Sequence, residues 1–160
     1  MAEDHSVNGR RHVKVVIAVP NEGMTQYMAY DNRMLMMIHL GQLAERSKHE
    51  PVTKDGAVFE FYHFTAGRLL TPAARESLTD HALSAGMDYM LMIDDDMTTP
   101  IDMFERLYEN NVDVVAPLAF TRNPPHYAVI YESEDEIDPI TRSKNFLNHY
   151  ARNYPENQLV

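Results

Sequence analysis

Residues 88–96 read DYMLMIDDD, an apolar run that ends in three consecutive aspartates. The short apolar stretch lies between Gly86 and the charged triplet, which predicts a buried β-strand. In an open α/β sheet, ligands bind in the crevice beyond the carboxyl ends of the strands. Asp94, Asp95 and Asp96 are therefore expected at a ligand-binding edge.

The segments around this strand alternate between strand and helix patterns. Further strands are predicted at 12–19, 57–64, 112–120 and 127–131, where β-branched or aromatic residues gather. Helices are predicted at 25–46, 71–84 and 101–109, with one more around 140–150. The alternating order predicts an α/β fold with a mixed, mostly parallel sheet flanked by helices.

Two of the predicted helices carry start signals. Thr71-Pro72 opens one of them, with threonine as N-cap and proline in the first turn. Thr99-Pro100-Ile101-Asp102 has the pattern of a capping box, so Thr99 is expected to cap the helix at 101–109. The methionine-rich run at 34–37 favours core packing over an adaptable binding face.

The length of 160 residues is that of one domain. The composition changes after Tyr131, where the acidic run ESEDE (132–136) begins a polar tail. We therefore expect a flexible segment at 1–12, a folded domain at 13–131 and an acidic, polar tail at 132–160.

Charge and composition restrict the class of partner. The formal net charge is −10 and no stripe of lysine or arginine is present, which argues against nucleic-acid binding. Cysteine is absent, and no apolar run approaches the roughly 18 residues that span a bilayer. The first dozen residues lack the apolar core of a signal peptide. A cytoplasmic protein is expected, and a homo-oligomer is compatible with the sequence.

Three adjacent carboxylates repel one another unless a cation or strong donors neutralise them. Hard oxygen ligands suit Mn²⁺ or Mg²⁺, and such an ion can join the carboxylates of the triplet to the phosphates of a nucleotide. The alternative is a solvated acidic turn that also caps the following helix. Because the triplet ends a buried strand, the metal site is the favoured interpretation.

The stretch 67–120, GRLLTPAARESLTDHALSAGMDYMLMIDDDMTTPIDMFERLYENNVDVVAPLAF, resembles the middle of GT-A glycosyltransferases of the family 2 kind. In those proteins an Ala-Arg-Asn helix start, a Gly-x-Asp-Tyr strand start and an Asp-x-Asp motif recur in this order. The opening strand with Pro20, Asn21 and Glu22 is similar to their first strand and base-binding loop. The resemblance covers about 13–131 and implies a Rossmann-like GT-A nucleotide-sugar-binding fold without the usual C-terminal acceptor half.

The resemblance also implies roles for single residues. Asp96 would be the metal ligand, Asp94 would contact the ribose or reach the metal through water, and Asp95 is the variable middle position. Arg75 matches the arginine of the Ala-Arg-Asn motif and is a candidate for the base or diphosphate. Glu76 stands where the family has asparagine, which leaves that part of the site in doubt.

Other candidates lie in the loops at the same edge. Pro20, Asn21 and Glu22 would line the uracil or guanine pocket by the same resemblance. Arg68 could reach the diphosphate, with an ordinary surface arginine as the alternative.

The resulting functional hypothesis is sugar transfer from a UDP- or GDP-sugar to an unidentified acceptor, with inversion. The metal would act as Lewis acid for the leaving diphosphate. No catalytic base is assigned, because the only Glu-Asp pair after the triplet, Glu134-Asp135, lies in an acidic run that reads as a solvated face.

Two other hypotheses remain. One is a non-catalytic nucleotide-sugar-binding module or assembly domain, which the short tail favours. The other is a metal-dependent nucleotidyltransferase. That class is expected to show a glycine-rich basic loop after its first strand, and residues 20–23 read PNEG.

Overall fold

The computed structural model describes residues 6–7, 9–21, 27–67, 71–117, 119–120, 131–132 and 149–150. The chain divides into two compact units, Met1–Asn111 and Val112–Val160. Each unit is described by itself. The first unit contains the predicted acidic triplet.

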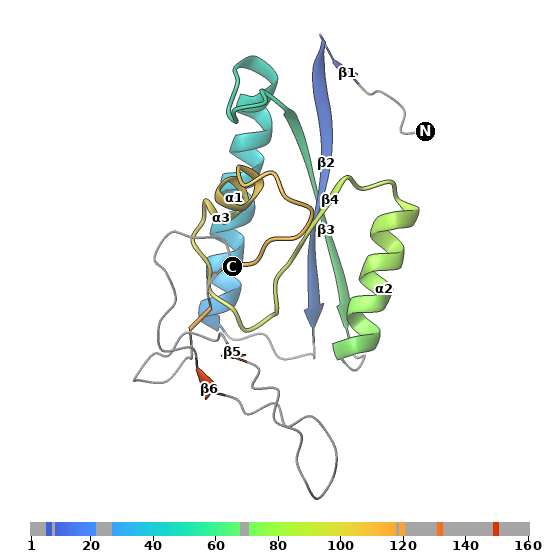
Figure 1. The fold of residues 1–160 in the computed structure, drawn as a ribbon, viewed down its shortest axis with the longest axis vertical. Coiled ribbons are helices and arrows are strands. Elements are labelled where there is room, and N and C mark those ends of the chain that lie inside the picture. The colour runs from blue at the N-terminus through green and yellow to red at the C-terminus, as the bar shows by residue number, and fades with distance from the viewer. Residues whose placement is uncertain are drawn as a thin grey trace, which may run out of the picture. The chain divides into compact units, whose positions relative to one another are not determined.

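The first unit is built around a parallel sheet of three strands (Figure 1). β2 (Arg10–Asn21) is central, with β3 (Val58–Gly67) on one side and β4 (Tyr89–Met92) on the other. The short β1 (Ser6–Val7) pairs antiparallel with the beginning of β2. Because the three long strands run parallel, their carboxyl ends meet at one edge of the sheet.

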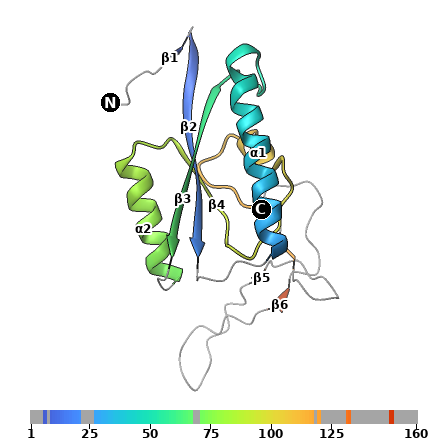
Figure 2. The same cartoon turned by 180° about the vertical axis from the view of Figure 1, so that it is seen from behind.

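Helices cover both faces of the sheet, as the two opposite views show (Figures 1 and 2). α1 (Tyr27–His49) and α3 (Met103–Tyr108) lie on one face, and α2 (Thr71–Ser84) lies on the other. The ring of Phe64 on β3 stacks on His81 of α2, with 4.2 Å between the ring centres. The result is an α/β unit whose parallel strands have the order β3-β2-β4.

The side chains of β2 explain why this strand is central. Val13, Val15, Ile17 and Val19 are completely buried and pack into the core with α1 and α3. Val16 and Ala18 are also completely buried, and they alternate with the first set toward the opposite face. A strand that is apolar on both faces needs cover on both, which fits a parallel sheet between helices.

An aromatic cluster completes the core on the side of α1 and α3. Phe104 of α3 meets Phe59 and Phe61 of β3 edge-on, with ring centres 5.3 and 5.0 Å apart. Tyr108 packs edge-on against Phe59 at 5.1 Å. The rings of Phe104 and Tyr108 thus hold the short helix α3 to the sheet.

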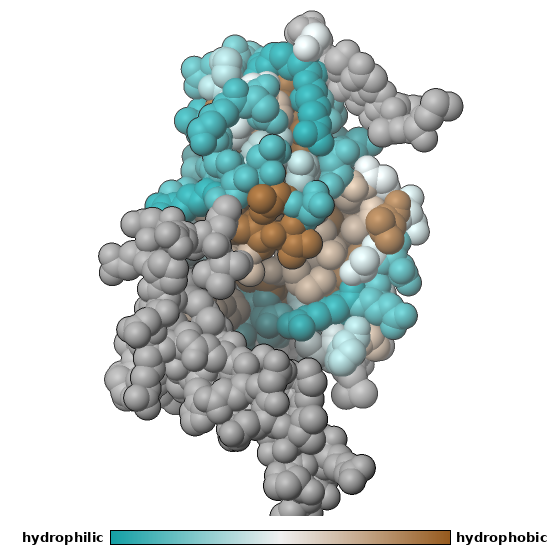
Figure 3. All heavy atoms as spheres, viewed as in Figure 1, coloured by the Kyte–Doolittle hydropathy of each residue, from teal (hydrophilic) through white to brown (hydrophobic). Residues whose placement is uncertain are grey.

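Hydrophilic residues cover the end of the unit at which α1 passes into β3 (Figure 3).

Most of the expected elements of the first unit are confirmed within a few residues. The strands predicted at 12–19, 57–64 and 88–93 correspond to β2, β3 and β4, and the helix predicted at 71–84 is α2. The methionine-rich run is divided, since Met36 is buried and Met34 is half exposed. No helix in the described part of the chain is long and apolar enough to cross a membrane.

The expected strand at 112–120 is wrong over residues 112–117. Residues 112–117 form no regular element, and Val114 is 90% exposed. The β-branched residues in this run matched a strand pattern, but β-propensity reports how well a side chain fits a pleated, half-buried surface. Pro117 also cannot donate a ladder hydrogen bond.

In the part of the second unit that the structure describes, two short strands form an antiparallel pair. β5 (Tyr131–Glu132) pairs with β6 (His149–Tyr150), so the end of the helix expected at 140–150 is a strand instead. Residues 127–130, which held most of the fifth expected strand, lie outside the described residues.

The expected cap at Thr99 is also wrong. α3 begins at Met103, and its N-cap residue is Asp102, which makes no side-chain capping bond. The Asp102 carboxylate instead pairs with Arg106 one turn later at 2.8 Å. The backbone N–H of Thr99 donates to Oδ1 of Asn32 on α1, so a tertiary contact replaces the local capping box.

Candidate functional site

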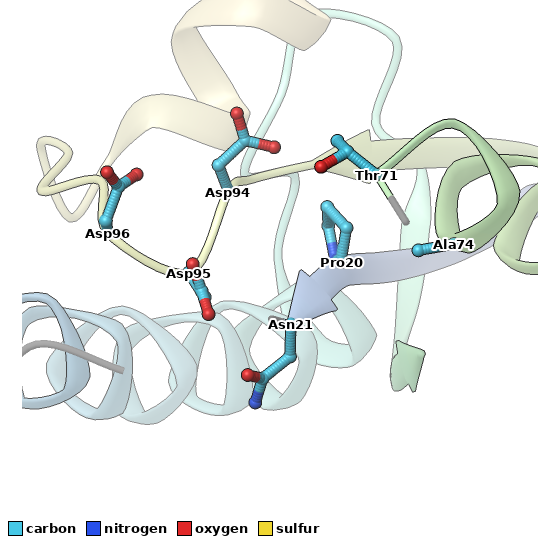
Figure 4. Close-up of a pocket in the computed structure, with 7 residues that line it drawn as sticks. All are labelled: Pro20, Asn21, Thr71, Ala74, Asp94, Asp95 and Asp96. Atoms are coloured by element: carbon cyan, nitrogen blue, oxygen red, sulfur yellow. The ribbon is translucent and has the colours of Figure 1, made fainter. Parts of the chain in front are cut away.

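A pocket of about 190 Å³ opens at the carboxyl edge of the sheet (Figure 4). Its lining comes from the end of β2, the start of α2 and the turn after β4, and consists of Pro20, Asn21, Thr71, Ala74, Asp94, Asp95 and Asp96. Pockets that enclose a whole drug-sized ligand are larger, at roughly 300–1,000 Å³. The pocket therefore has room for part of a nucleotide, such as its phosphate groups.

The strand register brings these residues together. Pro20 and Asn21 are the last residues of β2 and lie opposite Ala66 and Gly67 of β3. On the other side of β2, the N–H of Ile93 donates to the carbonyl of Ala18 at 3.0 Å, which extends the ladder by one residue beyond β4. Asp94 is consequently the first residue outside the sheet.

Asp94 is paired with Arg75 from the first turns of α2. Nη2 of Arg75 donates to both carboxylate oxygens of Asp94, over 3.0 and 3.1 Å. Both side chains are close to half exposed, at 48% and 44%. The pair places a guanidinium beside the acidic triplet and joins the face covered by α2 to the end of β4.

The other side of the triplet is held by α1. Nη2 of Arg33 donates to the backbone carbonyl of Asp95 at 2.9 Å. The Asn32 amide makes two bonds with the backbone of Thr99, since Nδ2 donates to the carbonyl and Oδ1 accepts from the N–H, each at 2.8 Å. The acidic turn is thus fixed from a helix more than 60 residues earlier in the chain.

Arg33 is a partly buried cation below the turn. Burial lowers the pKa of its guanidinium, and the nearby Asp95 carboxylate opposes that change. Its Nε is buried and has no hydrogen-bond partner among the described residues. Burial also lowers the pKa of His63 on β3, and the charge of Arg33 lowers it further. Arg33 therefore offsets part of the negative charge of the triplet.

The sequence did not identify Asn32 and Arg33 as site residues. Neither lies in a motif, and their partners are 67 and 62 residues away. Both occur in a helix whose local pattern reports only which face packs on the sheet. No local signal distinguishes them from other polar residues of α1.

The carboxylates can be tested against the requirements of Mn²⁺ or Mg²⁺. Within the described part of the chain, no three acidic or histidine side chains converge as a ready metal cage. In the view of Figure 4, Asp94 and Asp96 point to one side of the turn and Asp95 points to the other. Mg²⁺ is commonly held by one or two carboxylates together with substrate phosphates and water. The turn fits that kind of site.

The predicted site residues are largely brought together. The structure places Pro20, Asn21 and the three aspartates in one pocket, and Arg75 contacts it through Asp94. The expectation that the triplet lies at the same sheet edge as Pro20 is confirmed. Glu22 and Arg68 lie outside the described residues. The binding roles of all these residues remain predictions.

The fold and the pocket define a class but no family. The class is a small α/β domain with a parallel three-strand sheet and an acidic pocket at its carboxyl edge. Comparisons with family models, with curated proteins and with solved structures found no match.

Proposed function

We propose that the pocket binds the diphosphate of a nucleoside-diphosphate sugar together with Mn²⁺ or Mg²⁺, and that the protein is a GT-A-type glycosyltransferase. The observation that carries the proposal is the meeting of Arg75, Pro20 and the acidic triplet at the carboxyl edge of a parallel sheet. That edge is where α/β proteins of the Rossmann type bind nucleotides.

Charge explains why a cation belongs to the proposal. The pocket is lined by three aspartates in a chain of net charge −10, so a diphosphate alone would be repelled. Asp96 would hold the ion, with Asp94 beside it or linked through water. When bound, the ion supplies Lewis-acid stabilisation of the leaving diphosphate.

The chain's own residues divide the remaining tasks. Arg75 can donate to phosphate oxygens from the start of α2, because guanidinium groups bind phosphate in forked geometry. Pro20 and Asn21 border the pocket on the β2 side and would contact the base or ribose. Arg33 and Asn32 fix the turn that carries the aspartates, so they act as positioning residues.

One observation favours a non-catalytic binding module as a second candidate. Apart from the three aspartates, the described lining of the pocket contains no acidic or histidine side chain to deprotonate an acceptor hydroxyl. A domain with this lining can bind a donor without transferring its sugar.

The proposal is tested by calorimetric titration of the whole chain with UDP, GDP and their sugars, with and without Mn²⁺. Binding that requires the metal supports the proposal. Binding that is equal without metal contradicts the role of the triplet, and absence of binding to every nucleotide contradicts the function. Hydrolysis of the bound sugar donor in the presence of Mn²⁺ then separates an enzyme from a binding module.

A further inference from the structure

The first half of α1 is apolar on the side that faces away from the sheet. Six large side chains there are each between 46% and 79% exposed: Tyr27, Met28, Tyr30, Met34, Leu35 and Ile38. We call these six residues the outer face. The buried residues of the same helix, Ala29, Met36, Leu40, Leu43 and Ser47, lie on the opposite side. A helix on the surface of a monomer normally has a polar outer side.

The outer face is large enough to form an interface. Its six side chains together expose roughly 700 Å², which is near the area that each partner contributes to a standard interface. Asp31 is the one charged residue on this side of α1 between Tyr27 and Ile38. Depletion of charge is characteristic of the centre of protein interfaces.

Gly41 lies on the same side of α1, seven residues after Met34 and three after Ile38. A Cβ at this position would meet nothing within 4 Å, and its φ is not in the left-handed region. Neither packing within the described unit nor backbone conformation therefore calls for glycine. Glycine in the interior of a helix makes the helix less stable than most other residues would. The close approach of another chain is therefore a reason for a glycine at position 41.

We propose that two copies of this chain pair through the outer faces of antiparallel α1 helices, about a two-fold axis near Met34. In this arrangement Met34 meets its own counterpart, and Tyr30 of one copy meets Ile38 of the other. Tyr27 then lies over Gly41 of the other copy, seven residues on either side of the axis. A large ring opposite a missing side chain gives the self-complementary surface that a two-fold interface requires.

A membrane surface is the main competing occupant of such a face. Helices that lie on bilayers carry lysine and arginine beside the apolar face and are attracted by anionic lipids. Asp31 lies beside the outer face. Arg33 of the same helix donates to the Asp95 carbonyl instead, and Arg46, Lys48 and His49 are in the last turn. With a net charge of −10 for the whole chain, attachment to an anionic bilayer is disfavoured.

The test is sedimentation of the whole protein over a range of concentrations. Ile38→Glu places two charges in the proposed contact, and Gly41→Gln fills the space under Tyr27. Each is expected to raise the dimer dissociation constant at least about tenfold. Leu83→Glu, at a 72% exposed apolar residue of α2, is the matched control and should leave the constant unchanged.

The possible results divide clearly. A wild-type protein that is monomeric at every concentration overturns the proposal, and so does a dimer that resists both variants. Wild-type monomers that bind anionic vesicles and lose this binding with Ile38→Glu also overturn it, in favour of a membrane surface. If Ile38→Glu fails to fold, Gly41→Gln decides, because glutamine favours helix and on a solvated face would only raise the melting temperature. None of these readouts depends on nucleotide binding.

Discussion

Arg75 and Asp94 form a two-bond ion pair between the first turns of α2 and the end of β4. Both oxygens of the Asp94 carboxylate accept from one nitrogen of Arg75, at 3.0 and 3.1 Å. A cation at the triplet would attract the same carboxylate. Arg75 and a bound metal therefore compete for Asp94, while both attract a diphosphate.

This competition predicts opposite effects of Arg75→Met on two affinities. Without nucleotide, Mn²⁺ should bind more tightly, because the triplet has lost a neutralising cation. With Mn²⁺ present, UDP or GDP should bind about tenfold more weakly or worse, because a charged donor to phosphate is missing. The free energy of unfolding should change by less than about 1 kcal/mol, since the pair is half exposed.

Calorimetry with Mn²⁺ alone and then with nucleotide measures both affinities. Arg106→Met is the matched control, because Arg106 also forms an exposed ion pair, with Asp102 of the α3 N-terminus. If Arg75→Met behaves like the control in both titrations, Arg75 has no part in the site.

The turn should also depend on Asn32. Asn32→Asp keeps the acceptor for the Thr99 N–H but replaces the donor to the Thr99 carbonyl with a negative oxygen. We expect a loss of about 1–3 kcal/mol in the free energy of unfolding, because the contact is partly buried. Urea unfolding measures the loss, and faster exchange of the Thr99 amide hydrogen would locate it.

Asn110→Asp is the comparison for this variant. The Asn110 amide also donates to backbone carbonyls, of Arg106 and Leu107, at the end of α3. Because the Arg106 contact is exposed, a smaller loss is expected there. Equal losses in the two variants would contradict the role of Asn32 in fixing the turn.

The sheet and the pocket were predictable from the sequence for physical reasons. The run VVIAV of β2 is apolar on both faces, which is typical of a parallel strand covered on both faces. The acidic triplet follows an apolar strand, so its position at the carboxyl edge follows from the direction of the chain. These features depend on residues close together in the sequence.

The errors concern features that depend on distant residues. Thr99 has the pattern of a cap, yet its N–H bonds to Asn32, which is 67 residues away. Val114 has the composition of a strand, but it is 90% exposed, and strand formation needs a partner strand. The outer face of α1 was not expected either, because apolar residues at helical spacing look the same whether the core or another molecule covers them.

The contact between Tyr108 and Asp55 gives a prediction for the pH dependence of stability. The Tyr108 hydroxyl donates to Oδ2 of Asp55 at 2.6 Å. Burial raises the pKa of the Asp55 carboxyl, but hydrogen bonds from Tyr108, Thr53 and the Ala57 N–H outweigh it, so the pKa is lowered from 3.8. Burial is the main cause that raises the pKa of Tyr108 above its usual 10.0, and the hydrogen bond to Asp55 raises it further.

Tyr108→Phe should therefore lose about 1 kcal/mol of stability at neutral pH. A carboxyl whose pKa is lowered by folding contributes above its unfolded value and loses this contribution as pH falls through the folded one. A phenol whose pKa is raised by folding contributes to the free energy of unfolding below pH 10.0, and this contribution is lost as pH rises toward the folded pKa. The difference in free energy of unfolding between wild type and variant should be constant around neutral pH. It should shrink below pH 3.8 and above pH 10.0. A difference that is constant across the whole pH range would contradict this linkage.

Asp96→Asn is the decisive variant for the metal site. It keeps the shape of the side chain and removes one negative charge from the proposed shell of the ion. At an effective dielectric near 20, two unit charges about 4 Å apart interact by about 4 kcal/mol before desolvation is subtracted. Even a net loss of about 1.4 kcal/mol weakens binding tenfold. Metal-dependent binding of UDP or GDP should therefore be lost, while the melting temperature without metal stays equal or rises because carboxylate repulsion is relieved.

The comparison with two other aspartates makes this result specific. Asp95→Asn should weaken binding less, because Asp95 points away from the side shared by Asp94 and Asp96 (Figure 4). Asp80→Asn, on the exposed side of α2, removes the same charge outside the pocket lining. It should change neither the nucleotide affinity nor the melting temperature without metal. A solvated acidic turn predicts the same gain in stability for Asp96→Asn with unchanged nucleotide affinity. Measuring affinity and melting temperature on these three variants therefore separates a metal site from an acidic turn, and unchanged affinity in Asp96→Asn would exclude the metal site.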